Sequence, residues 1–391
     1  MGSRTPYFNI DVNRLLSNLS LLNSEFRSIW GNFIVGYSFK TNTLPWILKW
    51  MLDHGAYAEV VSSFEYNLAL NIGYSPDKII FNGPCKGDDT LIESLKNGSI
   101  VNLDNFREIS VIINNIDKFE GKKIKVGLRI NFDLEAHCPN ETILGNEPGR
   151  FGFNVENEDI FRAIDLLKTI PELKIVGFHG HHSTRSKSLK IFKAIATQIC
   201  KIKDCADSLE YIDMGGCFFG DKLGVPSFTE YAKTITSVFR QYDVPESVYL
   251  IMEPGAALIA SPVSYVCKVV DVKRVRDVTI VTTDGSITHI NSQMSNVKFR
   301  VSHNSTFKEI IPRQIISGFT CIEKDRFAEL IEDNKLCIGD EIVVYNVGAY
   351  TMSLAPLFIE LFPCVIVTED NTQTIARDAW SIDCFLQKST I

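Results

Sequence analysis

The first two-thirds of the chain alternates short apolar, β-branched segments with amphipathic segments that often end at a glycine. The apolar segments between residues 32 and 255 read NFIVGYSFK, YAEVVS, KIIFNG, SIVNLD, KIKVGLRIN, KIVGFHGHH, YIDMGG and YLIMEPG. Strands that are apolar along almost their whole length are typical of a parallel sheet covered by helices on both faces. Eight such strands in β/α alternation predict a closed (β/α)8 barrel, with a doubly wound open sheet as the alternative.

The pattern changes at Ser264, after which strand-like segments follow one another with little helix between them. These segments read YVCKVVDVKRV, VTIVTTDGSI, EIIPRQIISG and DEIVVYNVGAY. They predict a second domain, an antiparallel β-sandwich or barrel-like sheet that also includes the N-terminal segment. We therefore predict a barrel over residues 30–262 and a β domain made of residues 1–29 and 263–391.

Composition narrows the function classes. The formal net charge is −7 and the basic residues are spread along the chain, which argues against nucleic acid as a partner. The chain contains no apolar run of the roughly 20 residues that a membrane span requires, and its N-terminus lacks the pattern of a secretory signal. The ten cysteines form no CxxC pair. We therefore expect reduced thiols in a cytoplasmic protein.

Polar residues or glycines end nearly every predicted barrel strand. In chain order they are Lys40, Glu59 and Ser62, Asn82, Asp104, Arg129 and Asn131, the histidines at 179–182, Gly215 and Gly216, and Glu253. Barrel enzymes build their active sites at the carboxyl ends of the strands. The sequence therefore predicts an active site at this end of the barrel.

Two of these strand ends suggest covalent and phosphate chemistry. A lysine that is desolvated at a strand end has a lowered pKa, which suits Lys40 to imine formation, although a surface lysine is the simpler interpretation. The adjacent Gly215 and Gly216 would let backbone N–H groups approach a phosphate, and barrels often bind phosphate after strands seven and eight. A simple turn explains two glycines equally well.

The histidines and Glu253 suggest a flat, cationic ligand. His179 and His181 share one face of their strand and could bind zinc, but no further metal-ligand pattern accompanies them, and we predict no metal. The alternatives are a buried, hydrogen-bonded histidine or a ring stacked on a flat cofactor. A carboxylate buried at Glu253 would require a cationic or proton-donating partner, such as a protonated pyridine nitrogen.

These residues, in this order, resemble the fold-type III pyridoxal 5'-phosphate (PLP) decarboxylases, which include the diaminopimelate, ornithine and arginine decarboxylases. The similarity runs nearly end to end, and it implies a barrel of the alanine-racemase type. It is carried by YSFKTN (the family's Y-A-x-K-A-N), AEVVSSFEYNLAL (D-x-x-S-x-x-E-x-x-x-A), GRFGFN (the K-F-G box), FHGHHST (H-x-G-S), DMGGCFFG (D-x-G-G-G-F), EPG, FTCIEKD (P-x-C-[ED]-x-x-D) and NVGAYT (G-A-Y).

The resemblance implies a role for each motif residue. Lys40 would carry PLP as a Schiff base, Glu253 would keep the pyridine nitrogen protonated, and His181 would stack on the ring. The remaining implied cofactor contacts are Arg129, Thr184, Gly215, Gly216, Cys217 and Tyr350. The chemistry implied is loss of the α-carboxylate of an amino acid into the electron sink of the cofactor.

The cysteine motif implies a homodimer with shared active sites. In the family this cysteine comes from the partner subunit and protonates Cα, a role that falls to Cys321 here. A buried packing thiol is the simpler interpretation. Glu323 and Asp325 of the same motif are the predicted substrate contacts.

Among the positions that depart from the family pattern, three bear on phosphate and substrate binding. Cys217 replaces the third glycine of the phosphate loop, which a negative φ would tolerate. Ala256 replaces the arginine after E-P-G, and Ile322 replaces the acid after the motif cysteine. We therefore predict an atypical substrate in a biosynthetic pathway: a D-amino acid, or an aminocarboxylate attached to a siderophore, a carrier protein or a peptide-nucleotide antibiotic.

Three alternatives stay open. The first is an ordinary diaminopimelate, L-ornithine or L-lysine decarboxylase. The second is an amino-acid racemase of the same fold, although racemases usually place arginine, and not glutamate, at the pyridine nitrogen. The third is a non-catalytic regulatory homologue, against which the presence of Lys40, His181, Glu253, Cys321 and Tyr350 argues.

Overall fold

The computed structural model describes residues 5–219, 224–295 and 297–390. The chain divides into two compact units. One contains residues 19–40 and 45–257, and the other contains residues 1–18, 41–44 and 258–391. We call them the barrel unit and the β unit. Helix α1 (Val12–Ile29) begins in the β unit and ends in the barrel unit.

Eight parallel strands form the barrel unit. They are β2 (Phe33–Ser38), β3 (Tyr57–Val60), β4 (Ile79–Phe81), β5 (Ile100–Leu103), β6 (Ile124–Asn131), β8 (Leu173–His179), β9 (Tyr211–Asp213) and β10 (Tyr249–Met252). Their order is β5-β4-β3-β2-β10-β9-β8-β6, and pairing of β5 with β6 closes the ring. This confirms the predicted (β/α)8 barrel and excludes the open sheet. A two-residue strand, β7 (Phe153–Asn154), adds to β6.

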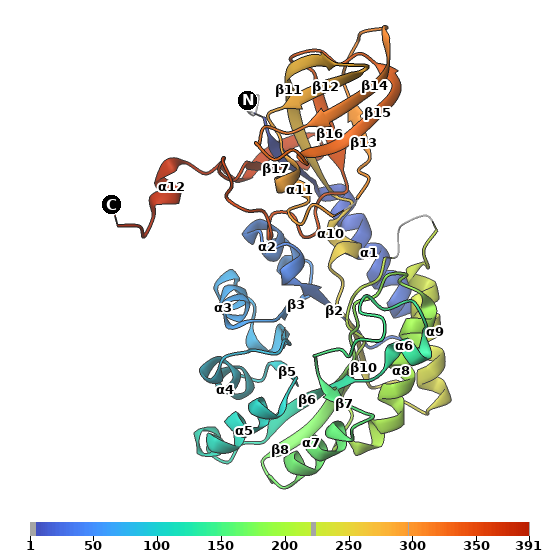
Figure 1. Ribbon diagram of the computed structural model, residues 1–391. Coiled ribbons are helices and arrows are strands. Elements are labelled where there is room, and N and C mark those ends of the chain that lie inside the picture. The colour runs from blue at the N-terminus through green and yellow to red at the C-terminus, as the bar shows by residue number, and fades with distance from the viewer. Residues whose placement is uncertain (1–4, 220–223, 296, 391) are drawn as a thin grey trace. The chain divides into compact units, whose positions relative to one another are not determined.

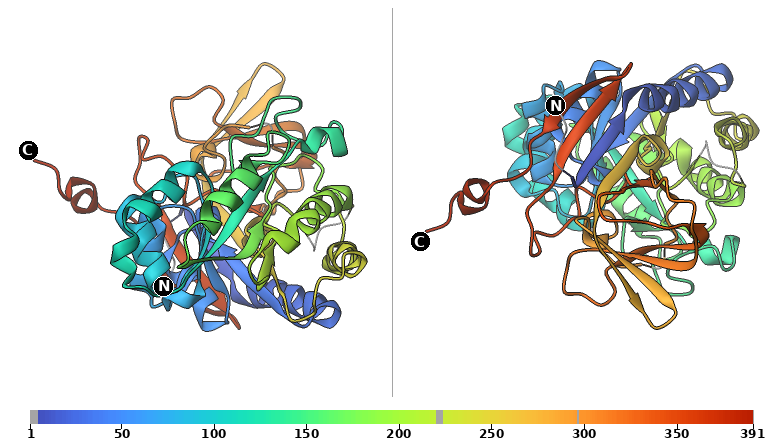
Figure 2. Two further views of the ribbon diagram at one scale, coloured as in Figure 1. Left: turned by 90° about the horizontal axis from the view of Figure 1, so that it is seen from below. Right: turned by 90° about the horizontal axis from the view of Figure 1, so that it is seen from above.

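Helices surround the barrel strands (Figure 1, Figure 2). They are α2 (Pro45–Asp53), α3 (Ser63–Ile72), α4 (Asp88–Lys96), α5 (Phe106–Asn114), α6 (Leu134–His137), α7 (Asp159–Lys168), α8 (Leu189–Ile202) and α9 (Phe228–Gln241), with single-turn 3-10 helices at Phe39–Thr41, Pro76–Lys78, Ile116–Phe119 and Lys203–Cys205. Within the described ranges, no helix has the length and apolar character needed to cross a membrane.

Local sequence signals fix where several helices begin and end. The Ser62 side chain accepts a hydrogen bond from the Glu65 N–H at the start of α3, and Gly73 ends this helix at a φ of 110°. Ser227 and Glu230 form a reciprocal capping box at the start of α9. Such caps satisfy N–H groups that have no partner inside the helix. The loops that lead from strands to helices are therefore held at defined points.

Tyr211 fills the interior of the barrel beside two glycines. A Cβ atom at Gly177 would lie about 2.5 Å from the Tyr211 ring, and one at Gly127 would also collide with this side chain. The Tyr211 hydroxyl donates to Asn102 Oδ1 at 2.7 Å. The surrounding buried cluster contains Ile34, Ile80, Val176 and Ile251. The barrel is therefore a packed core, and chemistry is confined to its open end.

The β unit contains a nine-stranded sheet. Its strands are β1 (Tyr7–Asp11), β11 (Val263–Val275), β12 (Val278–Thr283), β13 (Val301–His303), β14 (Ile310–Ser317), β15 (Arg326–Asn334), β16 (Glu341–Tyr345), β17 (Cys364–Glu369) and β18 (Thr372–Arg377). Three short helices belong to this part of the chain or border it: α10 (Ala256–Ile259), α11 (Ile287–Ile290) and α12 (Ile382–Leu386).

The predicted C-terminal β domain is confirmed, and its sheet is mixed, with two parallel pairs among the antiparallel ones. β1 pairs with β17 in parallel, and β12 pairs with β14 in parallel, whereas the other pairs are antiparallel. The N-terminal strand β1 inserts between β11 and β17, which lie far away in the sequence. The hydrophobic pattern of a strand does not record the direction of its neighbours, so this mixed arrangement was not visible in the sequence.

Candidate active site

Lys40 lies directly after β2 and is paired with a buried carboxylate. Its Nζ lies 2.7 Å from Glu59 Oε2 and 2.8 Å from the Ser38 hydroxyl. The Lys40 side chain is 38% exposed, so the expected desolvation of this lysine is only partial, whereas Glu59 is 1% exposed. The ammonium is therefore accessible from the open end of the barrel and is held in place by groups from β2 and β3.

The environment of Glu59 keeps it charged. Burial by itself raises the pKa of Glu59. The Lys40 ammonium, together with hydrogen bonds from Lys40, Ser38 and Asn82, outweighs burial and brings the pKa below its usual value. Glu59 is therefore a carboxylate at neutral pH, and it balances the charge of Lys40.

Glu253 and Asp213 form a second, tightly coupled pair of carboxyl groups. Both are buried, and Asn82 Nδ2 donates to Glu253 Oε1 at 2.5 Å. Burial, followed by the negative charges of Asp213 and Glu59, raises the pKa of Glu253 well above its usual value. Burial also raises the pKa of Asp213, to about 7, although the hydrogen bond from Glu253 opposes this. Glu253 therefore holds a proton at neutral pH and donates it to Asp213.

His179 ends β8 beside this acid pair. Its side chain is 2% exposed, and neither ring nitrogen has a hydrogen-bond partner among the described residues. Its Nε2 lies 3.7 Å from Glu253 Oε2. Burial, and then the Arg129 charge, lower the pKa of His179 well below its usual value, so the ring is neutral. One ligand atom from each of His179, Asp213 and Glu253 lies within 4.8 Å of the others.

His181 is held by the glycine loop. The Gly216 N–H donates to His181 Nδ1 at 3.0 Å. Burial, and then Arg129, lower the pKa of His181 well below its usual value. Because Nδ1 accepts this bond, only Nε2 of His181 is left to contact another group. A neutral imidazole in a fixed orientation is suited to stacking on a flat ring.

The adjacent glycines are required by close packing. A Cβ atom at Gly215, whose φ is 63°, would lie 2.6 Å from His181 Nδ1, and one at Gly216 would meet the Glu253 carbonyl. The Gly215 N–H donates to Asp213 Oδ1 at 3.0 Å. Both glycine N–H groups thus have partners within the protein. The predicted contacts of Gly215 and Gly216 with phosphate stay predictions.

Cys217 adopts a left-handed conformation, with a φ of 69°. The expectation that a negative φ would make cysteine tolerable at this position was wrong. The next residue along the loop, Phe218, is buried among Phe192, Phe228 and Tyr231, which anchors the loop in this conformation. Strained backbone of this kind is common at functional sites.

Thr184 and Lys187 lie against Cys217. Thr184 is 2% exposed, and its Oγ1 lies 3.7 Å from Cys217 Sγ. Lys187 Nζ donates to Cys217 Sγ at 2.6 Å and to the Thr184 carbonyl at 2.8 Å. Thr184 and Cys217 were predicted from the sequence, whereas Lys187 was not. No motif marks this lysine, and its place follows only from the path of the loop after β8.

Arg129 is fixed by ionic and stacking contacts. Its Nη1 lies 3.0 Å from Asp104 Oδ2, its Nη2 donates to the His181 carbonyl at 3.3 Å, and its guanidinium lies 4.6 Å from the centre of the Phe151 ring. Among the described residues, its buried Nε has no hydrogen-bond partner. The direct cofactor contact expected of Arg129 stays a prediction.

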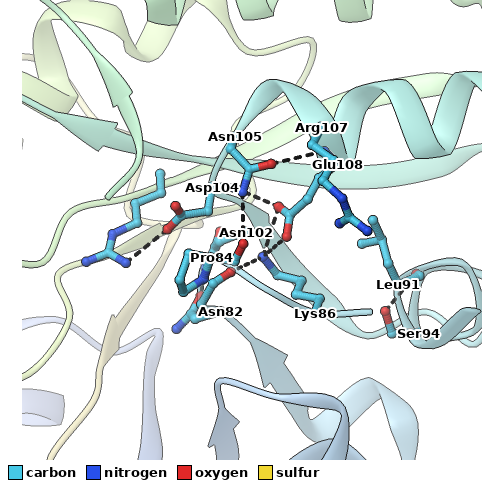
Figure 3. Close-up of polar contacts among 12 residues, drawn as sticks. Asn82, Pro84, Lys86, Leu91, Ser94, Asn102, Asp104, Asn105, Arg107 and Glu108 are labelled. Atoms are coloured by element: carbon cyan, nitrogen blue, oxygen red, sulfur yellow. Dashed lines mark hydrogen bonds and ion pairs between the residues drawn. The ribbon is translucent and has the colours of Figure 1, made fainter. Parts of the chain in front are cut away.

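A fully buried ion pair, Lys86–Glu108, lies beside Asp104 and holds its backbone (Figure 3). Lys86 Nζ lies 2.9 Å from Glu108 Oε1 and donates to the Gly83 carbonyl at 2.7 Å, while Glu108 Oε2 accepts the Asp104 N–H at 2.8 Å. Both side chains of the pair are 0% exposed. Burial lowers the pKa of Lys86 and raises that of Glu108, and the partner's charge opposes each of these two shifts. This pair was not predicted from the sequence.

The residues predicted to act on the substrate, and the predicted cofactor contact Tyr350, lie in the β unit. Cys321 is exposed, in the segment between β14 and β15, which excludes the simpler interpretation as a buried packing thiol. Glu323 is 96% exposed and 3.7 Å from Arg326. Tyr350 is 46% exposed, at a φ of 57°, and its N–H donates to the Thr41 carbonyl at 2.8 Å.

Asp325 has a structural role in the β unit. Its buried carboxylate accepts hydrogen bonds from the Ile287 N–H at 2.8 Å, from the Ser286 hydroxyl at 3.0 Å and from the N–H and hydroxyl of Thr320 at 3.1 and 2.6 Å. Both oxygens are therefore occupied. The substrate contact predicted for Asp325 stays a prediction, and these bonds do not favour it.

The barrel residues fit a phosphorylated pyridine aldehyde. Lys40 offers an amine, and the protonated Glu253 offers its proton to a ring nitrogen. His181 offers a flat neutral face. Beside Glu253, both ring nitrogens of His179 are buried and have no hydrogen-bond partner among the described residues. An excess of buried carboxyl groups is stabilised by a cation, which a protonated pyridine supplies.

Comparisons with known proteins also indicate a pyridoxal-dependent protein. The family model described as "pyridoxal-dependent decarboxylase, pyridoxal binding domain" matches residues 16–260. A probable chloroplastic diaminopimelate decarboxylase of Oryza sativa is 27% identical over 384 residues, covering 95% of this chain and 76% of the relative. The diaminopimelate decarboxylase of Bacteroides thetaiotaomicron is 26% identical over 357 residues, covering 89% and 91%.

Solved structures share the fold. The crystal structure of a diaminopimelate decarboxylase from M. jannaschii superposes with a TM-score of 0.88 at 23% identity, covering 100% of this chain and 93% of that one. An arginine decarboxylase of Paramecium bursaria Chlorella virus superposes with a TM-score of 0.75 at 20% identity, covering 91% and 93%. Both alignments cover at least 91% of this chain, so they include the barrel unit and most of the β unit.

Proposed function

The chain belongs to the pyridoxal-dependent decarboxylase family, and from this premise we propose that it removes the α-carboxylate of an amino acid whose distal end differs from those of diaminopimelate and ornithine. It is a PLP-dependent amino-acid decarboxylase. The observation that carries the chemistry is the buried Asp213–Glu253 pair beside the Lys40–Glu59 ion pair, because this combination offers both an amine and a proton-holding carboxyl group.

These contacts support a different role for each residue of the site. Bound PLP supplies an electron sink for the electron pair released when CO2 leaves. Lys40 would hold the cofactor covalently, and Ser38 and Glu59 keep its amine in place. Glu253 would hold the proton of the pyridine nitrogen, and its buried position keeps water away from that proton. His181 would keep the ring flat.

The last step adds a proton to the α-carbon, so that one proton is consumed for each CO2 released. We assign this proton to the thiol of Cys321 of a second subunit, in a homodimer with shared active sites. The exposure of Cys321 supports the assignment, since a thiol that serves another subunit has to lie at the surface. Glu323, which is also exposed, is the acidic residue of the same segment that would contact the substrate.

Two uncharged positions support an atypical substrate. Ala256, at the start of α10, and Ile322, next to Cys321, stand where the family pattern has an arginine and an acid. Neither can pair with a charged group at the distal end of a substrate. A D-amino acid, or an amino acid whose side chain is joined to a larger scaffold, would not require those two contacts.

Diaminopimelate is the second candidate. The relatives named above that cover 89% and 95% of this chain are named as diaminopimelate decarboxylases. A different set of side chains would then have to bind the distal ammonium and carboxylate of this substrate.

A substrate panel decides between the two. The purified protein, supplied with PLP, is incubated with meso-diaminopimelate, L-lysine, L-ornithine, L-arginine and the D-isomers, and CO2 and the amine product are measured. We expect weak or no turnover of free meso-diaminopimelate and L-ornithine. Turnover at ordinary rates, with kcat/KM of about 10⁴ M⁻¹s⁻¹ or more, would contradict the atypical substrate. Epimerisation at Cα without CO2 release would indicate a racemase.

A further inference from the structure

We propose that Lys187 is a phosphate-binding residue of this enzyme, and that it supplies from the loop after β8 the positive charge that Ala256 cannot supply after β10. The inference rests on the proposed function, since the phosphate is that of PLP. It concerns a residue that no motif marks.

The position of the Lys187 ammonium supports this inference. Its Nζ lies between two residues of the predicted phosphate site, 2.6 Å from Cys217 Sγ and 2.8 Å from the Thr184 carbonyl. Its Nζ also lies 6.0 Å from the centre of the Phe219 ring, and within the described part of the chain it has no carboxylate partner. An ammonium without a carboxylate partner at a glycine loop is a ready point charge for a phosphate.

The phosphate loop needs such a charge. The N–H groups of Gly215 and Gly216 already donate to Asp213 and His181, so they bring little to a phosphate. The family's arginine is replaced by Ala256. A phosphate monoester carries a charge of about −1.5 to −2 at neutral pH, and neutral donors alone balance it poorly. Lys187 is the cation that the described structure places against this loop.

The backbone of Lys187 is built to hold that position. Its φ is 59°, a left-handed conformation that is unfavourable for lysine. The hydroxyl of Tyr231, a buried residue of α9, donates to the Lys187 carbonyl at 2.5 Å and anchors the turn. An exposed lysine with no ligand would gain nothing from such an anchor, because a relaxed turn would serve as well. The strain therefore favours a positioned side chain.

The test compares two cofactors that differ only in the phosphate. Affinities of the apo-protein for PLP and for pyridoxal are measured by equilibrium dialysis for the wild type, Lys187→Gln, Lys187→Arg and the control Lys190→Gln, an exposed lysine at the start of α8. In Lys187→Gln we expect PLP affinity to fall roughly 10- to 100-fold, as for loss of a hydrogen bond between charged groups, with pyridoxal affinity unchanged. Lys187→Arg should recover most of the preference.

The outcomes separate this inference from the proposed function. If the wild type binds PLP no better than Lys40→Ala does, the proposed function fails. If the wild type prefers PLP over pyridoxal and Lys187→Gln keeps the same preference, the function stands and the role of Lys187 is overturned. Loss of the preference in Lys190→Gln to the same extent would also overturn it, because the effect would then be one of general surface charge.

A second measurement requires no substitution. The ³¹P resonance of cofactor bound to the wild type is followed between pH 5 and 8. An ammonium beside the phosphate should keep it dianionic over this range, so that the resonance stays constant, whereas a free monoester titrates near pH 6. A bound phosphate that titrates as it does in solution would contradict a Lys187 contact even if the variants failed to fold.

Discussion

Two groups of buried charges lie at the carboxyl ends of the barrel strands, and they differ in how fully their charges are balanced. In the Lys86–Glu108 group, one ammonium meets one carboxylate, and both are further bonded to backbone atoms. The group that contains Lys40 has three buried acids, Glu59, Asp213 and Glu253, and its ammonium is paired with Glu59. His179, beside Glu253, has no hydrogen-bond partner among the described residues.

The difference distinguishes an ion pair with a structural role from a group of residues suited to bind a cofactor. A balanced pair needs no ligand, so Lys86 and Glu108 hold the loop that carries Asp104 (Figure 3). Asp104 in turn pairs with Arg129. An unbalanced group keeps a proton on Glu253 and raises the pKa of Asp213 to about 7, which leaves it ready to receive a cation. Perturbed pKa values of this second kind are the ones that cluster at functional sites.

The largest effect is expected at Lys40. Lys40→Ala removes the amine that would bind PLP covalently, so decarboxylation should fall by roughly 10⁴-fold or more, equivalent to about 5.5 kcal/mol. Bound cofactor should no longer absorb near ~420 nm, where PLP linked to lysine absorbs. Lys49→Ala, which removes an exposed lysine of α2, is the matched control. Persistence of that absorbance in Lys40→Ala would refute the assignment.

Removing one partner of the balanced group should cost stability. Lys86→Met leaves Glu108 buried without its cation, and we expect the free energy of unfolding of the barrel unit to fall by about 3–5 kcal/mol. Urea denaturation measures the loss. The double variant Lys86→Met/Glu108→Leu, which removes both charges, should recover much of it. A loss below about 1 kcal/mol in the single variant would show that this pair is not the scaffold described here.

Removing one acid from the unbalanced group should lower catalysis and leave stability intact, the reverse of the result expected for Lys86→Met. Glu253→Gln keeps the hydrogen bond from Asn82 but cannot hold the proton of a ring nitrogen. We expect kcat to fall by roughly 10²- to 10³-fold, with stability unchanged or increased. Steady-state kinetics and urea denaturation check both parts, and Glu246→Gln, at an exposed position, is the control. Wild-type kcat in Glu253→Gln would contradict the role of Glu253.

The smallest effect concerns pH. The pKa of Asp213 is about 7 in the folded protein, compared with an ordinary value of 3.8. Between these values the folded state holds a proton that the unfolded state has lost. The contribution of Asp213 to the stability of the apo-protein is therefore fully present below about pH 4, and it is lost as the pH rises through 7. Asp213→Asn should flatten this dependence by at most about 1.4 kcal/mol per pH unit. Parallel stability–pH curves for the two proteins would contradict the raised pKa.

Local pattern determined much of the site in advance. Residues that end parallel strands must meet at one end of a closed barrel, so Lys40, Glu59, His181, Gly215 and Glu253 could be brought together from the sequence. The glycines were also identified, but for an incomplete reason. The structure shows that they make room for His181 and for the Glu253 carbonyl, which is a matter of packing between neighbouring strand ends.

The sequence by itself determined the barrel, the order of its strands and the chemical types at its open end, because hydrophobic periodicity and strand-end polarity are local properties. Only the tertiary structure decided which charges are balanced. Lys86 and Glu108 are 22 residues apart, and Lys187 and Cys217 are 30 residues apart, so their pairing depends on how the loops fold back. The parallel pairing of β1 with β17 was also decided by the tertiary structure, because the hydrophobic periodicity of a strand does not determine which strand it pairs with or in which direction.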